Sequence, residues 1–455
     1  MPKILLVYPP FCTPASPPYS LTYLYSFLKS NLLNDFEPFQ IELLDLNILF
    51  HSLKFADDQK YFQNFSQNDY DEKAKDFLFR TSQCYTENNK KVVQGENPEL
   101  LDLLIQEIKK RKADVIALSI VYSSQAFYTI TLLQELKKIG VKTIIGGPAV
   151  NQKLKDSADV YLKNEVDFLE YLLGEKIRHE KLQVHRVLDF SLFAAEDYFT
   201  PKLVVPLRTS NSCFYKQCSF CTHHGNADYI EHDLEDIKQT IILSGQKYFF
   251  FIDDMIPKKR LLEIAALLKP LSVFWMCQLR PTKDLDLETL QLLHDSGLKV
   301  IIWGVESGCD RILQLMKKGT QTKDVVKVLH DSHAVGIANV LYIMFGFPTE
   351  TEEEFLMTID FLKENSQVID LISTSTFGLQ KESPMFAKAK EFGIVQIRTK
   401  ERTILEPQIS YETNAGLSQL QLFKKLKGHK KTIEAINKFP KQMNFFREHM
   451  LVKVE

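Results

Sequence analysis

Short apolar runs alternate with amphipathic helical patterns along the first third of the chain. The strand patterns lie at 3–8, 41–48, 114–122 and 142–147, and the helical patterns at 20–30, 100–110 and 126–140. Near-continuous runs of Val, Ile and Leu are typical of buried parallel strands, and apolar residues three and four apart are typical of helices. The alternation predicts a doubly wound α/β domain over residues 1–180.

Two stretches near this domain lack a clear pattern. Residues 54–95 mix charges, amides and aromatics, so we expect an insertion or lid rather than a fold element. A weaker unit at 158–176 completes the domain. Residues 181–202 carry few periodic signals, and we expect a linker there.

A second series of strand and helix patterns occupies residues 203–384. Strands and helices alternate at roughly 30 residues per repeat, the size of one βαβ unit. Six successive strands of this kind predict a partial (β/α)6 barrel, whose working residues would lie at the carboxyl ends of the strands. Polar residues do collect at these ends: Cys213, Cys218, Cys221, Asp253, Asp254, Arg280, Glu306, Thr349 and Glu350.

Composition limits the class of protein. The chain has 455 residues, 45% hydrophobic and 25% charged, enough for two or three globular cores. A net charge of -2 argues against a general attraction to nucleic acid or anionic membranes. Apolar runs fall short of the roughly 18 residues of a membrane helix, and the start MPKILLVYPP lacks signal-peptide features, so we expect a cytoplasmic protein without a membrane partner.

Residues 385–455 show weak helical patterns and predict a small helical extension. From Gln421 onward this tail holds nine Lys and Arg against three Glu. We interpret it as a solvated helical cap on the barrel, with a contact to an anionic substrate or RNA as the alternative.

Three cysteines stand close together, Cys213, Cys218 and Cys221, in a C-x4-C-x2-C spacing. Thiolates at such spacing bind zinc or an iron-sulfur cluster. A zinc knuckle would need a fourth ligand, which His223 or His224 could supply. A two-iron ferredoxin centre would instead need a further cysteine, Cys277 or Cys309. Three cysteines alone leave one iron of a cubane cluster open to another ligand, as in catalytic metal sites.

A cysteine triplet after the first strand of a partial barrel, with Phe220 directly before the last cysteine, resembles the radical S-adenosylmethionine superfamily. The resemblance covers about 203–380. It departs from the usual C-x3-C-x2-C triplet by one extra residue between Cys213 and Cys218, and members with a longer first spacing occur. The resemblance implies a TIM-like radical SAM barrel, with a 4Fe-4S cluster on the three cysteines and S-adenosylmethionine on the fourth iron.

The same resemblance implies roles for residues at later strand ends. Phe220 would lie beside the adenine, and Asp253 and Asp254 would face the amino end of S-adenosylmethionine. Arg280 would meet its carboxylate. A helix cap and a surface ion pair are the alternative explanations for the aspartates and the arginine.

Two further strand ends match positions of the family. Glu306 in GVESG would lie near the ribose, with a buried structural carboxylate as the alternative. Gly346 in GFPTE resembles a turn near the adenine, although a Gly-Pro turn occurs in many proteins.

The first domain resembles the Rossmann-like, cobalamin-binding domain that precedes many radical SAM barrels. The resemblance rests on VYPP, ALSIVYSS and IIGGP, and it points to Pro9, Pro10, Ser119, Tyr122, Gly146 and Gly147 as cofactor-binding residues. Glycines after a strand allow a large cofactor to approach the backbone closely. A doubly wound domain without a cofactor would use the same features for its turns.

The loop after the first strand, residues 8–12, has no histidine, and the chain lacks a D-x-H-x-x-G motif. Bound cobalamin would therefore have no protein imidazole on its lower face, which favours radical methylation over mutase chemistry. Cys12 is the remaining candidate for a cobalt ligand, but a lone cysteine is more often a small buried residue.

The sequence thus predicts a cobalamin-dependent radical SAM enzyme, a methyltransferase acting on a peptide or small molecule, with flavodoxin or ferredoxin as electron donor and no nucleic-acid partner. A cobalamin-free radical oxidase and a methylthiotransferase are alternatives. The latter normally has three more cysteines in its first domain, where this chain has only Cys12 and Cys84. A zinc-stabilised binding protein, with Cys213, Cys218, Cys221 and His223 as ligands, is the alternative from another class.

Overall fold

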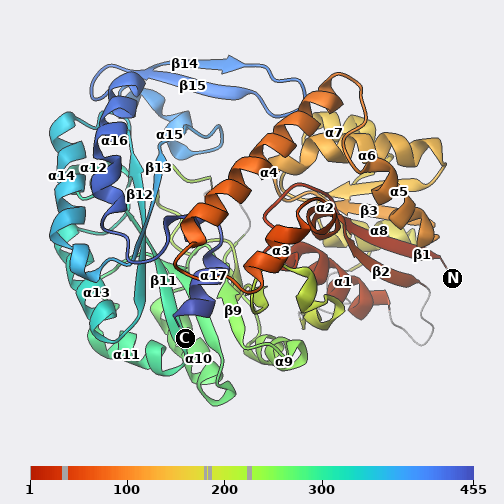
Figure 1. Cartoon of the computed structure of the whole chain (residues 1–455), viewed down its shortest axis with the longest axis horizontal. Coiled ribbons are helices and arrows are strands. Elements are labelled where there is room, and N and C mark those ends of the chain that lie inside the picture. The colour runs from red at the N-terminus through yellow and green to blue at the C-terminus, as the bar shows by residue number, and fades with distance from the viewer. Residues whose placement is uncertain (1, 33–38, 179–181, 183–186, 223–227, 455) are drawn as a thin grey trace. The chain divides into compact units, whose positions relative to one another are not determined.

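The computed structural model describes residues 2–32, 39–178, 182, 187–222 and 228–454 (Figure 1). The chain forms two compact units. Unit 1 comprises Met1–Val205, Glu235–Gly245 and Glu401–Glu406, and unit 2 comprises Pro206–Leu234, Gln246–Lys400 and Pro407–Glu455. Within the described ranges, no helix has both the length and the apolar character needed to cross a membrane.

Unit 1 contains a five-stranded sheet in the order β2-β1-β3-β4-β5, and all its pairings are parallel. Ile4–Val7 of the inner strand β1 are fully buried because helices cover both faces of the sheet. The order reverses between β1 and β3, and ligands of such sheets bind outside the carboxyl ends of the strands at this point. The doubly wound prediction is confirmed. The strands are β1 (Lys3–Tyr8), β2 (Gln40–Asp45), β3 (Val115–Ser119), β4 (Lys142–Gly146) and β5 (Val160–Tyr161).

The helices around this sheet follow the apolar spacing of the sequence. In α5 (Leu101–Lys110), the buried residues are three and four positions apart, so they form one apolar stripe. Asp45 ends β2 and caps the next helix by accepting a hydrogen bond from the backbone N of Ile48 at 3.0 Å. The other helices of this part of the chain are α1 (Tyr19–Leu32), α2 (Leu46–Lys54), α6 (Ala126–Lys138), α7 (Gln152–Ser157) and α8 (Glu165–Leu173). Helix α9 (Leu234–Ser244) follows later in the chain, and its residues from Glu235 onward also belong to unit 1.

Residues 54–95, expected to be an insertion or lid and not a fold element, form two regular helices. They are α3 (Ala56–Phe62) and α4 (Tyr70–Val93). The buried residues of α4 recur every three or four positions, but the polar side chains of Thr81 and Asn88 occupy part of the stripe. The polar residues Thr81 and Asn88 at buried positions make the helical pattern hard to recognise in the sequence. Phe77 packs against Phe62 and Phe199, so this stretch belongs to the core of unit 1 and the expectation is corrected.

Residues 181–202, expected to be a linker, lie partly outside the described residues, which omit 181 and 183–186. The remainder carries two short 3-10 helices, η3 (Phe190–Leu192) and η4 (Ala195–Asp197). The side chains of Phe190, Tyr198 and Phe199 are buried. The described part of this segment is therefore packed onto unit 1.

Unit 2 is built on a six-stranded sheet in chain order, β6-β9-β10-β11-β12-β13. The pairings from β9 to β13 are parallel. Among the described residues β6 and β13 form the two edges, so the sheet is open, and the predicted partial barrel is confirmed. The strands are β6 (Val204–Leu207), β9 (Tyr248–Phe251), β10 (Phe274–Leu279), β11 (Leu298–Glu306), β12 (Ala338–Phe345) and β13 (Leu371–Thr376).

One face of this sheet, the outer face, carries the helices of the repeats. Trp303 donates a hydrogen bond to Asn339, whose amide donates to the carbonyl of Leu329 in α13. Phe345 contacts Phe355 of α14. Side chains alternate along a strand, so Tyr342 of β12 points to the opposite, inner face. The outer helices are α10 (Lys258–Leu268), α11 (Leu287–Asp295), α13 (Thr322–Ala334) and α14 (Glu352–Glu364), and Figure 1 shows the last three side by side.

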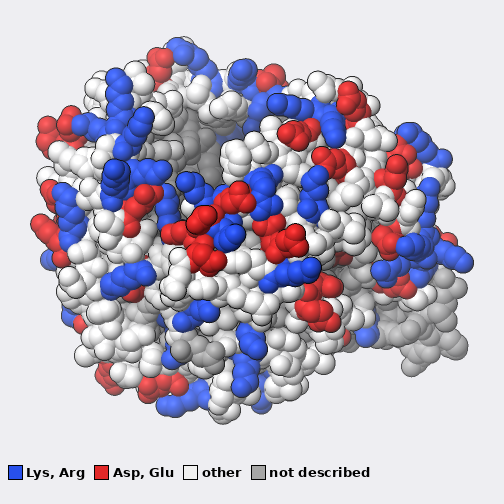
Figure 2. Space-filling view, in the orientation of Figure 1, with Lys and Arg blue, Asp and Glu red and all other residues white. Residues whose placement is uncertain are grey.

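The C-terminal region is only partly helical. After α15 (Pro384–Ala387), the antiparallel hairpin β14 (Ile394–Lys400) and β15 (Gln408–Thr413) differs from the predicted helical extension. The side chains of β14 are mostly exposed, and the alternation of β15 rests only on Ile409 and Tyr411, too short a pattern to predict a strand. Helices α16 (Gln419–Glu434) and α17 (Arg447–Lys453) follow. Lysines cover the exposed side of α16, where Figure 2 shows a group of blue side chains.

The turn after β12 encloses a buried carboxyl group. Gly346 has a φ of 76°, and Leu422 of α16 fills the space of a Cβ at this position. The backbone N of Gly346 donates to Glu350 at 2.6 Å. Burial raises the pKa of Glu350 to about 7, against the hydrogen bond from Gly346, which lowers it.

The aromatic core under α4 gives a test of its structural role. Phe77 is 1% exposed and Phe79, two positions along the same helix, is 60% exposed. We expect Phe77→Ala to lower the free energy of unfolding by about 3–5 kcal/mol, because it leaves a cavity. The matched control Phe79→Ala should change it by less than about 0.5 kcal/mol. Urea unfolding measures both, and equal losses would contradict this assignment of α4 to the core.

The buried Glu350 predicts a pH dependence of stability. Its pKa is about 7 in the folded chain against 4.5 for an ordinary glutamate. The folded state therefore holds the proton more tightly, and this stabilisation is lost as pH rises through that window. As pH rises from about 5 to 8, the wild type should lose about 2–3 kcal/mol in free energy of unfolding that Glu350→Gln keeps, because glutamine has no proton to release. The exposed Glu364→Gln is the control, and parallel pH profiles for all three proteins would refute the prediction.

Candidate active site

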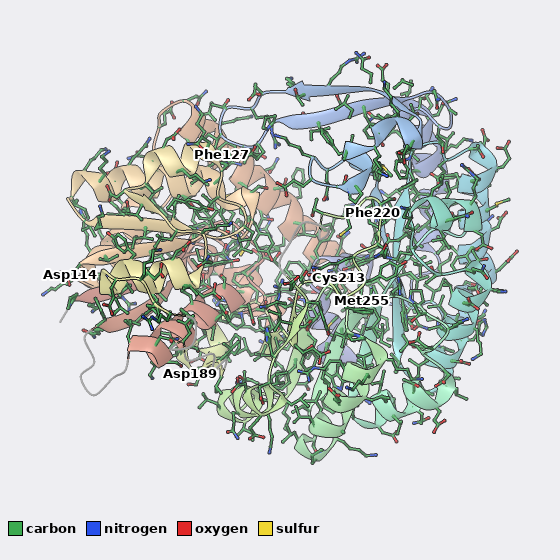
Figure 3. All side chains as sticks on the ribbon, turned by 180° about the vertical axis from the view of Figure 1, so that it is seen from behind. Asp114, Phe127, Asp189, Cys213, Phe220 and Met255 are labelled. Carbon is green, nitrogen blue, oxygen red and sulfur yellow. The ribbon has the colours of Figure 1, made fainter. Side chains whose placement is uncertain are left out.

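The three cysteines lie on one loop of unit 2, which we call the cysteine loop, residues 212–222. It follows β7 (Ser210–Asn211), at the carboxyl end of β6. Cys213, Cys218 and Cys221 are half-buried, and none of the three forms a disulfide. Figure 3 shows Cys213 and Phe220 of this loop in the middle of the view, away from the outer helices. The loop occupies the place expected for a working site in such a sheet.

The cysteine loop docks on the end of helix α12 (Asp310–Leu315). The hydroxyl and the backbone N of Ser219 donate to the carbonyls of Leu315 and Met316, each at 2.9 Å. The hydroxyl of Tyr215 donates to the carbonyl of Lys317 at 2.8 Å. The last carbonyls of a helix have no partner within it, so the loop supplies the missing donors. This contact fixes the backbone between Cys213 and Cys221.

Asp253 holds the chain just before the cysteine loop. Its carboxylate accepts hydrogen bonds from the backbone N and hydroxyl groups of Thr209 and Ser210, at 2.8–3.0 Å. Burial raises the pKa of Asp253, although these donors oppose the shift. Both oxygens are engaged, so the structure gives Asp253 a positioning role. The neighbouring Asp254 is half-buried at the same strand end.

A buried ion pair joins the end of β11 to the segment after α12. The ammonium of Lys318 lies 2.9 Å from the carboxylate of Glu306, with side chains 7% and 11% exposed. Burial lowers the pKa of Lys318, but attraction to Glu306 and Cys218 outweighs it, and the net pKa is raised. A Cβ at Gly304 would lie 2.8 Å from the ammonium, so this glycine leaves room for Lys318.

Arg280 connects the end of β10 to the same segment. Its guanidinium lies 3.5 Å from the ring centre of Tyr215 and donates to the carbonyl of Lys318 at 2.9 Å. Burial raises the pKa of Cys218, while Lys318 and Arg280 lower it. Two cations therefore act on the thiol of Cys218. Lys318 also lies 6.0 Å from the ring centre of Phe220.

Several buried polar atoms around this loop lack a hydrogen-bond partner among the described residues. An unpartnered buried donor costs about 1–3 kcal/mol, so a group of them fits a site where a polar ligand supplies the partners. The atoms are Arg208 Nε, Ser212 Oγ, Arg280 Nε and Thr320 Oγ1.

The donor set fits a cluster better than a single ion. In the part of the chain described here, no three His, Cys, Asp or Glu side chains converge on one metal position. The histidines proposed for a zinc knuckle, His223 and His224, lie outside the described residues. A cubane takes one thiolate on each of three irons, so its cysteines need not meet at one point. Three half-buried thiols on one anchored loop satisfy this requirement.

In unit 1, the predicted cofactor residues lie at the carboxyl edge of the sheet, on either side of its switch point. Gln125 bridges the two loops there, because its amide donates to the carbonyl of Pro9 at 2.7 Å. Pro10 is buried beside it. Ser119 donates to the hydroxyl of Ser20 at 2.9 Å, and Tyr122 is 54% exposed. This edge therefore presents hydroxyl groups in the position where such sheets bind ligands.

The two glycines after β4 serve the backbone itself. A Cβ at Gly147 would lie 2.3 Å from the carbonyl oxygen of Ile120, and its φ is 114°. A Cβ at Gly146 would lie 3.3 Å from the carbonyl of Leu162. Close packing of the chain requires Gly147, so this position is no sign of a ligand by itself.

His51 is the one histidine among the described residues of unit 1, and it is fully buried. One ring nitrogen lies 2.7 Å from the carbonyl of Asn47, and the other contacts the hydroxyl of Tyr85. Burial lowers the pKa of His51 to about 4. Both nitrogens are engaged, so this imidazole is not available to a metal. Burial also raises the pKa of Cys12, which makes its thiolate rare at neutral pH.

Sequence reasoning missed Lys318 and Tyr215, which connect the site to α12. The signal for Lys318 was its place in Lys-Lys-Gly after a short helical run. Gly319 is required there, because its Cβ would lie 2.4 Å from the hydroxyl of Tyr215. The predicted residues Phe220, Arg280 and Glu306 do meet at one place, around Lys318.

Two curated relatives are similar to parts of the chain. A probable threonylcarbamoyladenosine tRNA methylthiotransferase of Methanocaldococcus jannaschii is 25% identical over 316 residues, 62% of this chain and 71% of the relative. A bacteriochlorophyllide d C-12(1)-methyltransferase of Chlorobaculum tepidum is 28% identical over 173 residues, 36% of this chain and 38% of the relative. The second match thus covers well under half of either protein.

Two solved structures share the fold along nearly the whole chain. The radical S-adenosylmethionine methyltransferase TsrM of Kitasatospora setae has a TM-score of 0.60 at 15% identity, covering 96% of this chain and 89% of that one. The cobalamin-dependent S-adenosylmethionine radical enzyme OxsB has a TM-score of 0.60 at 15% identity, covering 91% and 65%. Residues 207–362 match the family model of the Radical SAM superfamily. The matched region includes the cysteine loop and strands β9 to β12, so residues 207–362 are a Radical SAM domain.

Proposed function

We propose that this chain is a cobalamin-dependent radical S-adenosylmethionine methyltransferase that modifies an unactivated position of a peptide or small molecule. The observation that carries the proposal is the shared architecture of both units with TsrM and OxsB, whose solved structures contain bound cobalamin. The cluster supplies an electron for cleaving S-adenosylmethionine, and cobalamin serves as a methyl carrier.

In this proposal the residues of unit 2 hold the cluster and S-adenosylmethionine. Cys213, Cys218 and Cys221 bind three irons, and Phe220 lies beside the adenine. Arg280 has an unpartnered Nε to offer the carboxylate of S-adenosylmethionine.

The remaining proposed residues contact or support the ligand. Glu306, held by Lys318, faces the ribose. Asp254 faces the amino group, and Asp253 positions the strand end from which the cysteine loop starts. The turn at Gly346 lies near the adenine.

Unit 1 would bind the cobalamin at its sheet edge, with Pro9, Pro10, Ser119, Tyr122, Gly146 and Gly147 as the proposed contacts. The full engagement of His51 supports cobalamin without a protein imidazole from this residue. That ligation suits methyl transfer better than mutase chemistry. Seven cysteines that form no disulfide suit a reducing compartment such as the cytoplasm, where flavodoxin or ferredoxin would be the electron donor.

A methylthiotransferase is the second candidate, because the relative from M. jannaschii carries that description. Such enzymes normally hold a second cluster on three cysteines of the first domain. Before residue 205 this chain has only Cys12 and Cys84, and Cys84 is buried in α4. The cysteine count therefore favours methylation without sulfur insertion.

Anaerobically reconstituted protein tests the proposal when it is incubated with S-adenosylmethionine, a low-potential reductant and cobalamin. We expect 5'-deoxyadenosine from the wild type and none from Cys218→Ala, because the variant loses one iron ligand. Cys84→Ala, a buried cysteine far along the chain from the loop, is the matched control and should keep activity. Chromatography of the nucleosides measures the outcome.

S-adenosylhomocysteine formed only when cobalamin is present would support methyl transfer. Purified protein that carries one zinc and no iron would refute the radical reading. Equal 5'-deoxyadenosine formation by Cys218→Ala and the wild type would contradict the proposed cluster ligands.

A further inference from the structure

The end of the chain covers part of the inner face of the unit 2 sheet. Helix α17 contacts β9, β10 and β11, and Figure 1 shows it in dark blue in front of these strands. The preceding turn η9 (Lys441–Asn444) contacts β13, and Asn444 donates to the carbonyl of Ile372 at 2.8 Å. Phe446 and Met450 are fully buried. This segment is therefore an integral part of unit 2.

Arg447 opens α17 and presents an unpaired cation. Its guanidinium lies 4.8 Å from the ring centre of Tyr342 in β12. Its Nε is buried without a hydrogen-bond partner, and no acidic side chain of the described residues forms an ion pair with it. A half-buried guanidinium usually has a carboxylate or another acceptor, since its desolvation is costly.

Tyr342 links this cation to the candidate active site. In the sheet register it stands next to Gly304 of β11 and Ser373 of β13. Gly304 is the residue that leaves room for the Lys318–Glu306 pair, so the pair lies beside Tyr342 on the inner face. Burial raises the pKa of Tyr342, while Arg447 lowers it and Glu306 raises it. The ring of Tyr342 thus lies between Arg447, which has no ion-pair partner among the described residues, and Lys318, which is paired with Glu306.

The inner face near Arg447 is accessible. Its partly exposed side chains alternate with fully buried ones that face the outer helices. Glu306 is already paired with Lys318, while Glu448 of α17 also raises the pKa of Tyr342 without forming an ion pair with Arg447 among the described residues. The partly exposed inner residues are Phe250, Gln278, Tyr342, Met344 and Ser373.

We propose that Arg447 binds an oxyanion group of the substrate, a carboxylate or a phosphate, on the inner face of the unit 2 sheet. A guanidinium stacked on an aromatic ring keeps its edge free for two parallel hydrogen bonds to such a group. The anchor would hold the substrate with its reacting end toward the cysteine loop. The inference rests on the proposed function for the reaction, and it adds the chemical class of the substrate.

Binding of two probes to the cluster-loaded full chain tests this anchor. Benzoate represents a carboxylate and inorganic phosphate a phosphate group, and calorimetric titration measures the affinity of each without S-adenosylmethionine. We expect the wild type to bind at least one probe, and Arg447→Gln to bind it at least about tenfold more weakly, because charge-assisted hydrogen bonds are lost. The probe that binds identifies the oxyanion.

The exposed Arg398→Gln on β14 is the matched control, since it removes the same charge from an exposed position, and it should bind like the wild type. The proposal is overturned if the wild type binds neither probe, if Arg447→Gln binds as tightly as the wild type, or if the control loses as much. Should Arg447→Gln fail to fold, Arg447→Lys replaces it. Arg447→Lys keeps the positive charge but lacks the two parallel N–H groups of the guanidinium. An unchanged affinity of this variant for the probe would also overturn the proposal.

Cleavage of S-adenosylmethionine by the wild type is a separate readout. Probe binding that depends on Arg447, together with no 5'-deoxyadenosine, would reject the proposed function and leave the oxyanion site in place. Cleavage without that dependence would reject the anchor alone.

Discussion

The unsatisfied end of a short helix organises the active site of this chain. Helix α12 stops at Leu315, and the carbonyls that follow accept hydrogen bonds from Ser219, Tyr215 and Arg280. A helix end buried without such donors would be costly, so the docking stabilises α12 and the cysteine loop together. The spacing of the cysteines is thus set by contacts outside the loop, and one extra residue in the C-x4-C segment can be accommodated.

Burial of Lys318 is the second consequence of this docking. The chain turns back after α12, and Lys318 enters the inner face, where an isolated ammonium would be strongly disfavoured. Glu306 compensates it, at the expense of a left-handed backbone with a φ of 70°. Gly304 and Phe220 complete its surroundings. Breaking such a pair leaves a buried charge, so each partner holds the other in place.

Periodicity predicted the parts of the fold in which burial is one-sided or complete. The strand and helix alternation of both units and the polar strand ends follow directly from it. The helices within residues 54–95 were not predicted, because Thr81 and Asn88 occupy buried positions of α4 where a helical pattern would have apolar residues. The place of Lys318 in the site was not predicted, because its burial depends on Glu306, which comes near only in the folded chain. Asp253 was found as a candidate, but its engagement by Thr209 and Ser210 could not be read from spacing.

The chain end illustrates why a partial barrel needs residues from outside its repeats. Six strands leave an inner face that must be covered, since apolar side chains point to both sides of a parallel sheet. Phe446, directly before α17, and Met450 and Leu451 within it supply that cover. Helix α17 has 7 residues and is too short to be predicted from periodicity. Apolar side chains alone would be enough to cover the inner face of the sheet. The presence of Arg447 on the same helix, stacked on Tyr342 and without an acidic partner among the described residues, therefore calls for an explanation other than packing, and an anionic ligand on that face provides one.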